Sequence, residues 1–185
     1  MPIPFDKFIY QAAQKLRSAW YSAHYVAAMR LAPTIEHQED DPLPSWRTIY
    51  DDLNDLLMRD WSNIQHGLYP APPLAETNPI ANARKSVSFF RDLSAVNRRR
   101  QAGIGQEVFR PSLRGHYPRY YLQNFHYQSG GYLTDESAAL YDHQVEVLFV
   151  GGADAMRRQC LGSLIQFLKT AAFQKTKHLD VACGT

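Results

Sequence analysis

The chain has 185 residues, of which 45% are hydrophobic, and its formal net charge is +2. This length and hydrophobic fraction suffice for one sizeable core, so the composition excludes an intrinsically disordered chain. The near-neutral charge gives no strong electrostatic steering toward nucleic acid or an anionic membrane, although local charged patches can still form.

The sequence shows no membrane-spanning or secretory segment. No apolar run approaches the roughly 20 residues that cross a bilayer, and the start, MPIPFDKFIYQ, lacks the apolar core of a secretory signal. We therefore expect no transmembrane segment and a cytoplasmic location, or a plastid location in a photosynthetic eukaryote. Neither Cys160 nor Cys183 has metal-ligand spacing, and the histidines form no helical pair beside a carboxylate, so we predict no metal site.

Residues 1–103 have the pattern of a helical N-terminal region. Apolar residues recur at helical spacing from Phe5 to Leu31, and Pro33 closes the run. The predicted apolar stripe of this first helix is Phe5, Phe8, Ile9, Ala12, Leu16, Ala19, Trp20, Ala23, Val26 and Ala27. A second helix is expected between Ser45, which can cap it, and Gly67, which can end it. Its predicted stripe is Trp46, Ile49, Tyr50, Leu53, Leu56, Leu57, Trp61 and Ile64, and the first helix is the expected packing partner.

A third helix is predicted from Asn78-Pro79, which is typical of a cap followed by proline at the first helical position. Its predicted apolar face is Ile80, Ala83, Val87, Phe90, Leu93 and Val96. The helix ends in Arg98-Arg99-Arg100, and cations there complement the helix dipole. The alternative role for this triplet is a phosphate-binding patch together with Arg84, Lys85 and Arg91.

Residues 104–133 form an aromatic-rich connecting or lid segment. Aromatic residues, glycine, proline and arginine alternate there without a sustained helical period, which predicts irregular structure packed against something larger. One interpretation is a hydrophobic wrap over the sheet of a following domain. The other is a lid, hinged at Gly130-Gly131, in which Tyr127 and Tyr132 lie over a bound ligand.

Two more helices and a strand are predicted in residues 134–185. Thr134 can cap the fourth helix, and Gly151-Gly152 breaks the pattern before the fifth. The predicted apolar face of the fourth helix is Ala138, Leu140, Tyr141, Val145, Leu148 and Phe149. In the fifth helix, Met156, Cys160, Leu161, Leu164, Ile165, Phe167 and Leu168 are expected inward, and Arg157, Arg158 and Lys169 outward.

The last residues, His178–Thr185, read HLDVACGT. An apolar-acidic-apolar run that ends in small residues predicts a buried strand feeding a tight turn, the entry to an α/β unit. Gly184 would let main-chain N–H groups approach a ligand, and a buried Asp180 would need a cation or N–H groups as partners. The alternative is that Asp180 lies on the surface of a short, frayed terminal strand.

The sequence LDVACGT resembles the first cofactor motif of the class I S-adenosylmethionine-dependent methyltransferases and lacks only its closing glycine. The preceding run FHYQSGGYLTDESAALYDHQVEVLFVGGADAMRRQ, Phe125 to Gln159, resembles the lead-in of a cyanobacterial and plastid group related to the quinone-methylating branch. This likeness extends back to about Tyr117. The resemblance implies a Rossmann-like methyltransferase fold whose first strand lies here, so that this chain is mainly α and leads into an α/β domain. It also implies that S-adenosylmethionine is bound by Asp180, Ala182, Cys183, Gly184 and Thr185.

The resemblance implies that residues 134–185 are the incomplete start of a methyltransferase domain. The expected function is methyl transfer to a small-molecule acceptor, lipophilic or aromatic, with Tyr127 and Tyr132 over the cofactor or acceptor. A complete cofactor site would need residues beyond Thr185, so the 185 residues alone are expected to be inactive. The alternative is a non-catalytic helical interaction module. A third hypothesis is nucleic-acid binding through Arg98-Arg99-Arg100 and the aromatic- and arginine-rich stretch after it. The catalytic residues, the acceptor and the oligomeric state stay open.

Overall fold

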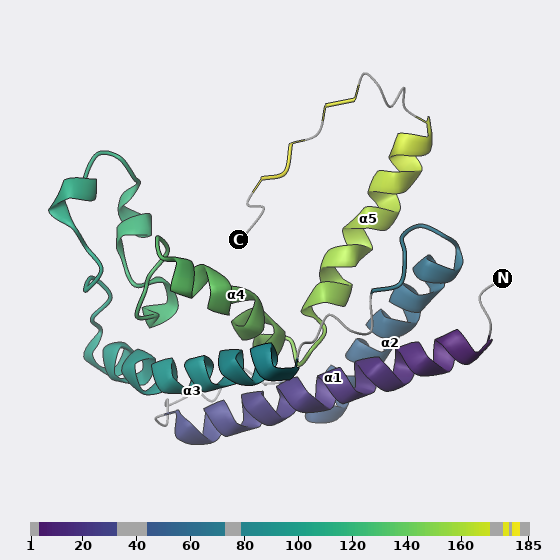
Figure 1. The fold of residues 1–185 in the computed structure, drawn as a ribbon, viewed down its shortest axis with the longest axis horizontal. Coiled ribbons are helices and arrows are strands. Elements are labelled where there is room, and N and C mark those ends of the chain that lie inside the picture. The colour runs from purple at the N-terminus through teal and green to yellow at the C-terminus, as the bar shows by residue number, and fades with distance from the viewer. Residues whose placement is uncertain (1–3, 33–43, 73–78, 171–175, 178, 182–185) are drawn as a thin grey trace. The chain divides into compact units, whose positions relative to one another are not determined.

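The computed structural model describes residues 4–32, 44–72, 79–170, 176–177 and 179–181. Over these ranges the chain forms five α-helices and three short 3-10 helices, and no described residue belongs to a β-strand (Figure 1). No helix in these ranges is long and apolar enough to cross a bilayer. The prediction of a mainly helical chain is confirmed, whereas its continuation into an α/β domain stays a prediction.

The helices belong to two compact units. The first unit comprises the described residues within 1–22, 37–76 and 149–184, and the second those within 23–36 and 77–148. Helix α1 (Pro4–Leu31) contributes its residues up to Ser22 to the first unit and the rest to the second.

In the first unit, α2 (Trp46–Gln65) packs against α5 (Ala153–Thr170). The predicted ends of α2 are confirmed, because Ser45 Oγ accepts a hydrogen bond from the Thr48 amide at 3.1 Å and Gly67 adopts a left-handed φ of 66°. The expected pairing of α1 with α2 is also confirmed in this unit. The ring of Tyr10 lies 5.2 Å from that of the buried Trp61.

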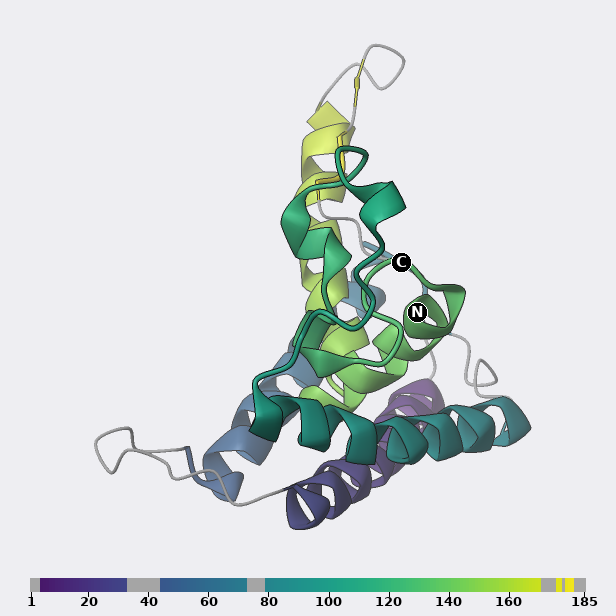
Figure 2. The ribbon, with the colours of Figure 1, turned by 90° about the vertical axis from the view of Figure 1, so that its left-hand side faces the viewer.

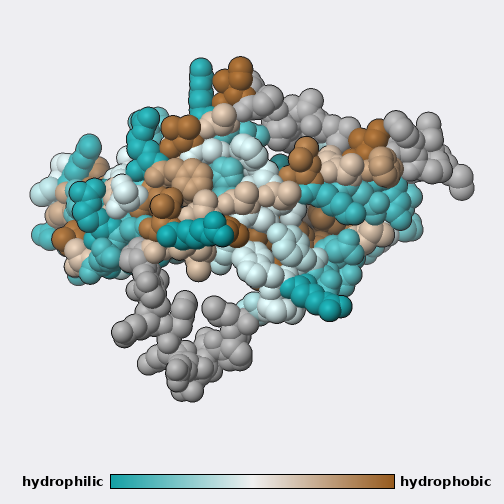
Figure 3. Space-filling view, turned by 90° about the horizontal axis from the view of Figure 1, so that it is seen from below, coloured by the Kyte–Doolittle hydropathy of each residue, from teal (hydrophilic) through white to brown (hydrophobic). Residues whose placement is uncertain are grey.

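The face that α1 buries is not the predicted one. Phe8, Ala12, Leu16, Ala19 and Trp20, all in the predicted stripe, are exposed. The buried residues of α1 are instead Tyr10, Ser18, Tyr21, Ser22 and His24. Hydrogen bonds explain part of this orientation: the Tyr10 hydroxyl donates to Asp60 at 2.5 Å, and the Tyr50 hydroxyl donates to Ser22 at 2.7 Å. Hydrophobic side chains accordingly reach the surface among hydrophilic ones, as on the face in Figure 3.

The predicted break at Gly151-Gly152 is confirmed and precedes α5. Gly151 has a φ of 87°, and a Cβ there would lie 3.0 Å from the Cα of Ser18. A Cβ on Gly152 would lie 2.8 Å from a methyl group of Leu53. Only glycine fits this close approach of the chain to α1 and α2 within the first unit.

The predicted orientation is wrong for four residues of α5. Arg158, expected outward, turns inward to the buried Asp60, and Met156, Cys160 and Phe167, expected inward, are exposed. The residues that α5 buries are small ones, Ala153, Ala155 and Gly162. A Cβ on Gly162 would lie 3.5 Å from a methyl group of Leu68, just beyond the end of α2, so the chain comes close to α5 there.

In the second unit, α3 (Pro79–Ala102) packs against α4 (Asp135–Leu148) and against η3 (Phe125–Tyr127). Helix α3 begins at Pro79 as predicted; its expected cap, Asn78, lies outside the described residues. Its predicted face is only partly right: Phe90, Leu93 and Val96 are half-buried. Ile80, Ala83 and Val87 are exposed, because α3 packs on the side that carries Phe89, Phe90 and Asn97.

Helix α4 begins with the predicted cap, since Thr134 Oγ1 accepts a hydrogen bond from the Ser137 amide at 3.3 Å. The residues that α4 buries are His143, Glu146 and Val147. Leu148 and Phe149, expected on the apolar face, are exposed. The apolar pattern therefore located the helix but misplaced its buried face at the C-terminal end.

Residues 103–134 run through turns and loops between α3 and α4 (Figures 1 and 2). Regular structure is limited to η1 (Pro111–Leu113), η2 (Arg119–Leu122) and η3. The prediction of irregular structure is confirmed.

Candidate functional site

Of the five predicted cofactor-binding residues, Asp180 is the one that lies among the described residues. Leu179, Asp180 and Val181 have no regular secondary structure, and all three are exposed. The strand predicted from His178 onward is therefore not formed at these three residues. A strand needs a neighbour to accept and donate its main-chain hydrogen bonds, and no strand is present among the described residues to do so. Ala182, Cys183, Gly184 and Thr185 lie outside the described residues.

Tyr132, one of the two predicted lid residues, belongs to a cluster of aromatic rings. Its ring stacks on Phe125 with centroids 4.3 Å apart and meets the edge of Tyr121 at 5.0 Å. Burial and the nearby Tyr121 and Tyr141 raise the pKa of Tyr132. Its phenol therefore stays protonated at neutral pH and can donate a hydrogen bond but not act as a base.

Tyr127, the other predicted lid residue, lines a pocket of about 650 Å³. The pocket is lined by Gly103, Ile104, Gly105, Gln106, Gln123, Asn124, Phe125, His126 and Tyr127. This volume is in the range of small-molecule sites, and the lining combines aromatic rings with amide groups. Phe125 links the two predicted lid residues, because it stacks on Tyr132 and lines the pocket together with Tyr127.

The backbone at the pocket is strained. His126 and Tyr127 adopt left-handed φ angles of 49° and 63°, which non-glycine residues rarely do. Each such residue costs on the order of 1–3 kcal/mol, and such strain often marks a ligand site. The hydrogen bond from the Arg99 guanidinium to the Tyr127 carbonyl, at 3.0 Å, helps to hold this conformation.

A buried asparagine fixes the wall of the pocket. Asn124 Oδ1 accepts a hydrogen bond from the Glu107 amide at 2.9 Å, and its Nδ2 donates to the Gln128 carbonyl at 2.7 Å. The Asn124 amide also donates to the Gly105 carbonyl at 2.8 Å. The role of Asn124 was not predicted from the sequence. It could have been suspected, because asparagine side chains in irregular segments commonly form hydrogen bonds with nearby backbone groups.

Arg99, from the predicted basic triplet, serves the same segment. Its guanidinium donates to Glu107 Oε2 at 2.6 Å and to Ser129 Oγ at 3.0 Å, and Ser129 also bonds Asp92. Arg99 therefore ties the pocket segment to α3 rather than facing a phosphate. Arg98 and Arg100 are exposed.

The first unit contains a buried polar cluster around Asp60, which no sequence pattern indicated. Asp60 has no exposed surface. It accepts hydrogen bonds from the hydroxyls of Tyr10 and Tyr69, the latter at 2.8 Å, and from Nε and Nη2 of Arg158. Burial, then the hydrogen bond and charge of Asp60, raises the pKa of Tyr10. Burial lowers the pKa of Arg158, but the hydrogen bond and charge of Asp60, together with Tyr10 and Asp154, raise it overall. Because every partner stays protonated, the cluster is suited to holding α1, α2 and α5 together and not to proton transfer.

The second unit contains a pair of buried histidines. His143 lies edge-on to His24 with ring centroids 5.5 Å apart, and His24 Nε2 lies 2.8 Å from the Ser86 hydroxyl. Burial, followed by the positive charges of His24 and Lys85, lowers the pKa of His143 to about 4. In the part of the chain that the structure describes, no group of three or more His, Cys, Asp or Glu residues could hold a metal ion.

No protein-family model matches the chain, and no curated protein or solved structure is significantly similar to it.

Proposed function

We propose that this chain is the N-terminal part of an S-adenosylmethionine-dependent methyltransferase. The observation that carries the proposal is the run Leu179–Thr185, with its cofactor-motif sequence following helix α5. Leu179 and Val181 are 81% and 77% exposed on either side of Asp180. In a parallel sheet such aliphatic residues are buried by neighbouring elements. Their exposure here is what we expect of a strand sequence without those elements, which supports the proposal.

The pocket beside Tyr127 supports an acceptor that is planar or lipophilic. Ile104, Phe125 and Tyr127 offer an apolar and aromatic surface, and Gln106 and Gln123 offer amide groups that could orient a polar substituent. Methyl transfer needs the donor and acceptor to be aligned and water to be excluded. A rigid pocket wall, such as the one that Asn124 holds, would position the acceptor. The proposal assigns no catalytic base.

The test is the binding of radiolabelled S-adenosylmethionine by the gene product purified from its source, with its intact mass compared with 21.2 kDa. We expect a larger mass and saturable binding, whereas the 185-residue chain alone binds weakly. Replacing Asp180 by Ala should weaken binding roughly ten- to a hundredfold, since a charged hydrogen-bond acceptor is lost. The control is Asp52→Ala, an exposed aspartate of α2. Equal binding by both variants, or no binding by the native protein, would contradict the proposal.

The second candidate function is a non-catalytic helical interaction module. It is favoured by the uncovered stripe of α1, in which Phe8 and Leu16 are 70% and 75% exposed two turns apart. If this stripe is a contact surface, Leu16→Lys should abolish an association that sedimentation detects in the native protein, whereas Lys15→Glu beside it should not. A native mass equal to that of this chain, with no cofactor binding, would favour this function over the methyltransferase.

A further inference from the structure

The exposed face of α3 carries a line of arginines. Arg84, Arg91 and Arg98 recur every seven residues, two turns of a helix, so they lie along one side of it. All three are exposed. The opposite side of α3 carries the half-buried Phe89 and Leu93, and this is the side on which α3 packs in the second unit.

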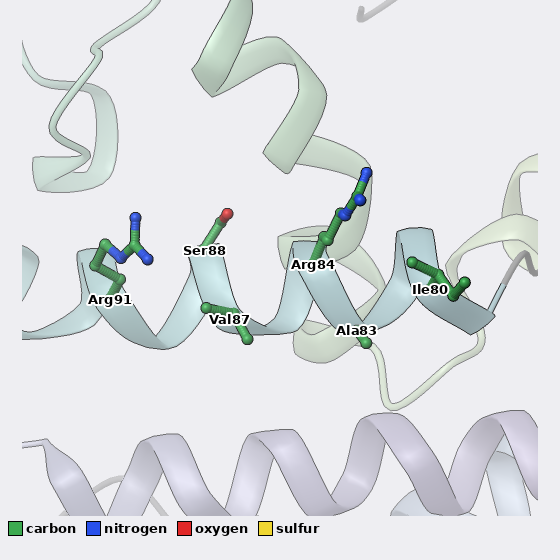
Figure 4. A pocket seen from close by; sticks show the side chains of 6 residues that line it. All are labelled: Ile80, Ala83, Arg84, Val87, Ser88 and Arg91. Atoms are coloured by element: carbon green, nitrogen blue, oxygen red, sulfur yellow. The ribbon is translucent and has the colours of Figure 1, made fainter.

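Aliphatic side chains accompany these arginines: Val87 lies between Arg84 and Arg91, and Ile80 lies about one turn before Arg84. Ile80 and Val87 are 64% and 57% exposed. Together with Ala83, Arg84, Ser88 and Arg91 they line an open groove of about 640 Å³. Figure 4 shows Val87 between Arg84 and Arg91 along the helix. The arrangement is an apolar strip edged by cations.

Within α3 itself, no acidic side chain lies on this face. The acidic residue of α3 is Asp92, which is turned to the loop and accepts hydrogen bonds from the amide and hydroxyl of Ser129. Lys85 and Arg100 are also exposed on α3, but on other sides of the helix. The helix therefore presents a positive surface although the whole chain is almost neutral.

We propose that this face of α3 docks the protein onto a lipid bilayer surface with anionic headgroups. Arginine heads reach the headgroups while their stems and the aliphatic residues between them enter the interface, which is the pattern of a helix lying on a membrane. Each cation near such a surface strengthens the attraction. A single-stranded nucleic acid fits less well, because it would call for exposed aromatic rings to stack on bases, and the rings of α3, Phe89 and Phe90, lie on its packed side. This inference does not depend on the proposed methyl transfer.

The test is co-sedimentation of the full chain with vesicles of phosphatidylcholine, with and without phosphatidylserine. We expect binding only to the anionic vesicles, and weaker binding as salt is raised. Removing the line of charge with Arg84→Gln/Arg91→Gln/Arg98→Gln should weaken partitioning by about a hundredfold, roughly fivefold for each arginine. Removing the aliphatic part with Ile80→Ser/Val87→Ser should weaken it by roughly fivefold.

The matched control is Lys15→Gln/Arg47→Gln/Lys169→Gln, which removes the same charge from exposed positions on α1, α2 and α5. It should retain most of the binding, and circular dichroism should show all three variants to be helical. Equal loss in the control would show that only net charge matters and would overturn the docking face. The proposal would also be overturned if the chain did not bind anionic vesicles but bound poly(U) or polyglutamate, and the arginine variant of α3 lost that binding. Binding to poly(U) would then indicate a nucleic acid as the partner, and binding to polyglutamate an acidic protein segment.

Discussion

Arg158 and Asp60, 98 residues apart in sequence, are joined by two hydrogen bonds, Nη2 to Oδ2 at 2.7 Å and Nε to Oδ1 at 3.0 Å. Because Asp60 is fully buried, removal of its partner leaves an uncompensated charge. We expect Arg158→Met to lower the free energy of unfolding by about 3–5 kcal/mol. Urea denaturation followed by circular dichroism measures this change.

Two further variants separate the pair from its surroundings. Asp60→Asn/Arg158→Met removes both charges and should be less destabilising than Arg158→Met alone, since no buried carboxylate is left without its cation. The neighbouring Arg157 pairs with Asp154 at the surface, so Arg157→Met should cost less than about 1 kcal/mol. Equal destabilisation by the variants at 157 and 158 would show that the Asp60 cluster does not stabilise the first unit.

The Asp60 cluster shows which features of the fold could be predicted from the sequence and which could not. Helix limits were predictable because they depend on neighbours in the chain, such as Ser45, Thr134 and Gly151. The buried faces were not, because they depend on hydrogen bonds between distant residues. Tyr10 turns α1 toward Asp60, and Arg158 turns inward against the expectation for a charged residue. An apolar stripe indicates a helix, but a polar network can decide which side of it is covered.

For the candidate site, the aromatic segment and Tyr127 could be identified from composition, but the pocket could not. Its wall depends on Asn124, which joins Glu107 and Gln128, and on Arg99, which was interpreted as part of a helix-end triplet. No local pattern specifies such bonds across an irregular loop.

The buried His143 should make stability depend on pH. Its pKa is lowered to about 4 in the folded protein, against 6.5 for an ordinary histidine, so the unfolded chain binds more protons between these values. Stability is therefore full above pH 6.5 and falls as the pH decreases toward 4. The loss from this residue is at most about 3 kcal/mol.

Unfolding measured by urea across this pH range, for the native chain and for His143→Gln, isolates the contribution. The difference between the two curves should change between pH 6.5 and 4 and be constant above pH 6.5. His24 and Lys85 act on the same ring and are present in both proteins. A constant difference throughout would contradict a neutral buried imidazole.

The turn before α5 should tolerate no side chain at Gly151. An alanine there would be strained at a φ of 87°, and its Cβ would meet the backbone of Ser18 at 3.0 Å. We expect Gly151→Ala to cost about 2–4 kcal/mol, from left-handed strain together with overlap. Gly115 has a φ of 88° with no atom within 4 Å of the added Cβ, so Gly115→Ala should cost only about 1–2 kcal/mol. Equal thermal shifts for both variants would rule out the close approach to Ser18.

Asn124 should control the order of the pocket wall. Asn124→Ala leaves the Glu107 amide without its partner and removes one of the two hydrogen bonds to the Gln128 carbonyl, and we expect a loss of about 1–3 kcal/mol. Hydrogen exchange should show faster exchange at the Glu107 amide. The exposed neighbour Gln123 provides the control, because Gln123→Ala should leave that amide protected.

The left-handed residues His126 and Tyr127 have a consequence for engineering this protein. Glycine at either position would relieve the strain and should make the fold more stable, yet the chain keeps an imidazole and a phenol there. A trade-off between stability and activity would account for this choice. His126→Gly would then be a thermostabilised form with an impaired pocket, which allows the demands of folding and of ligand recognition to be measured separately in one molecule.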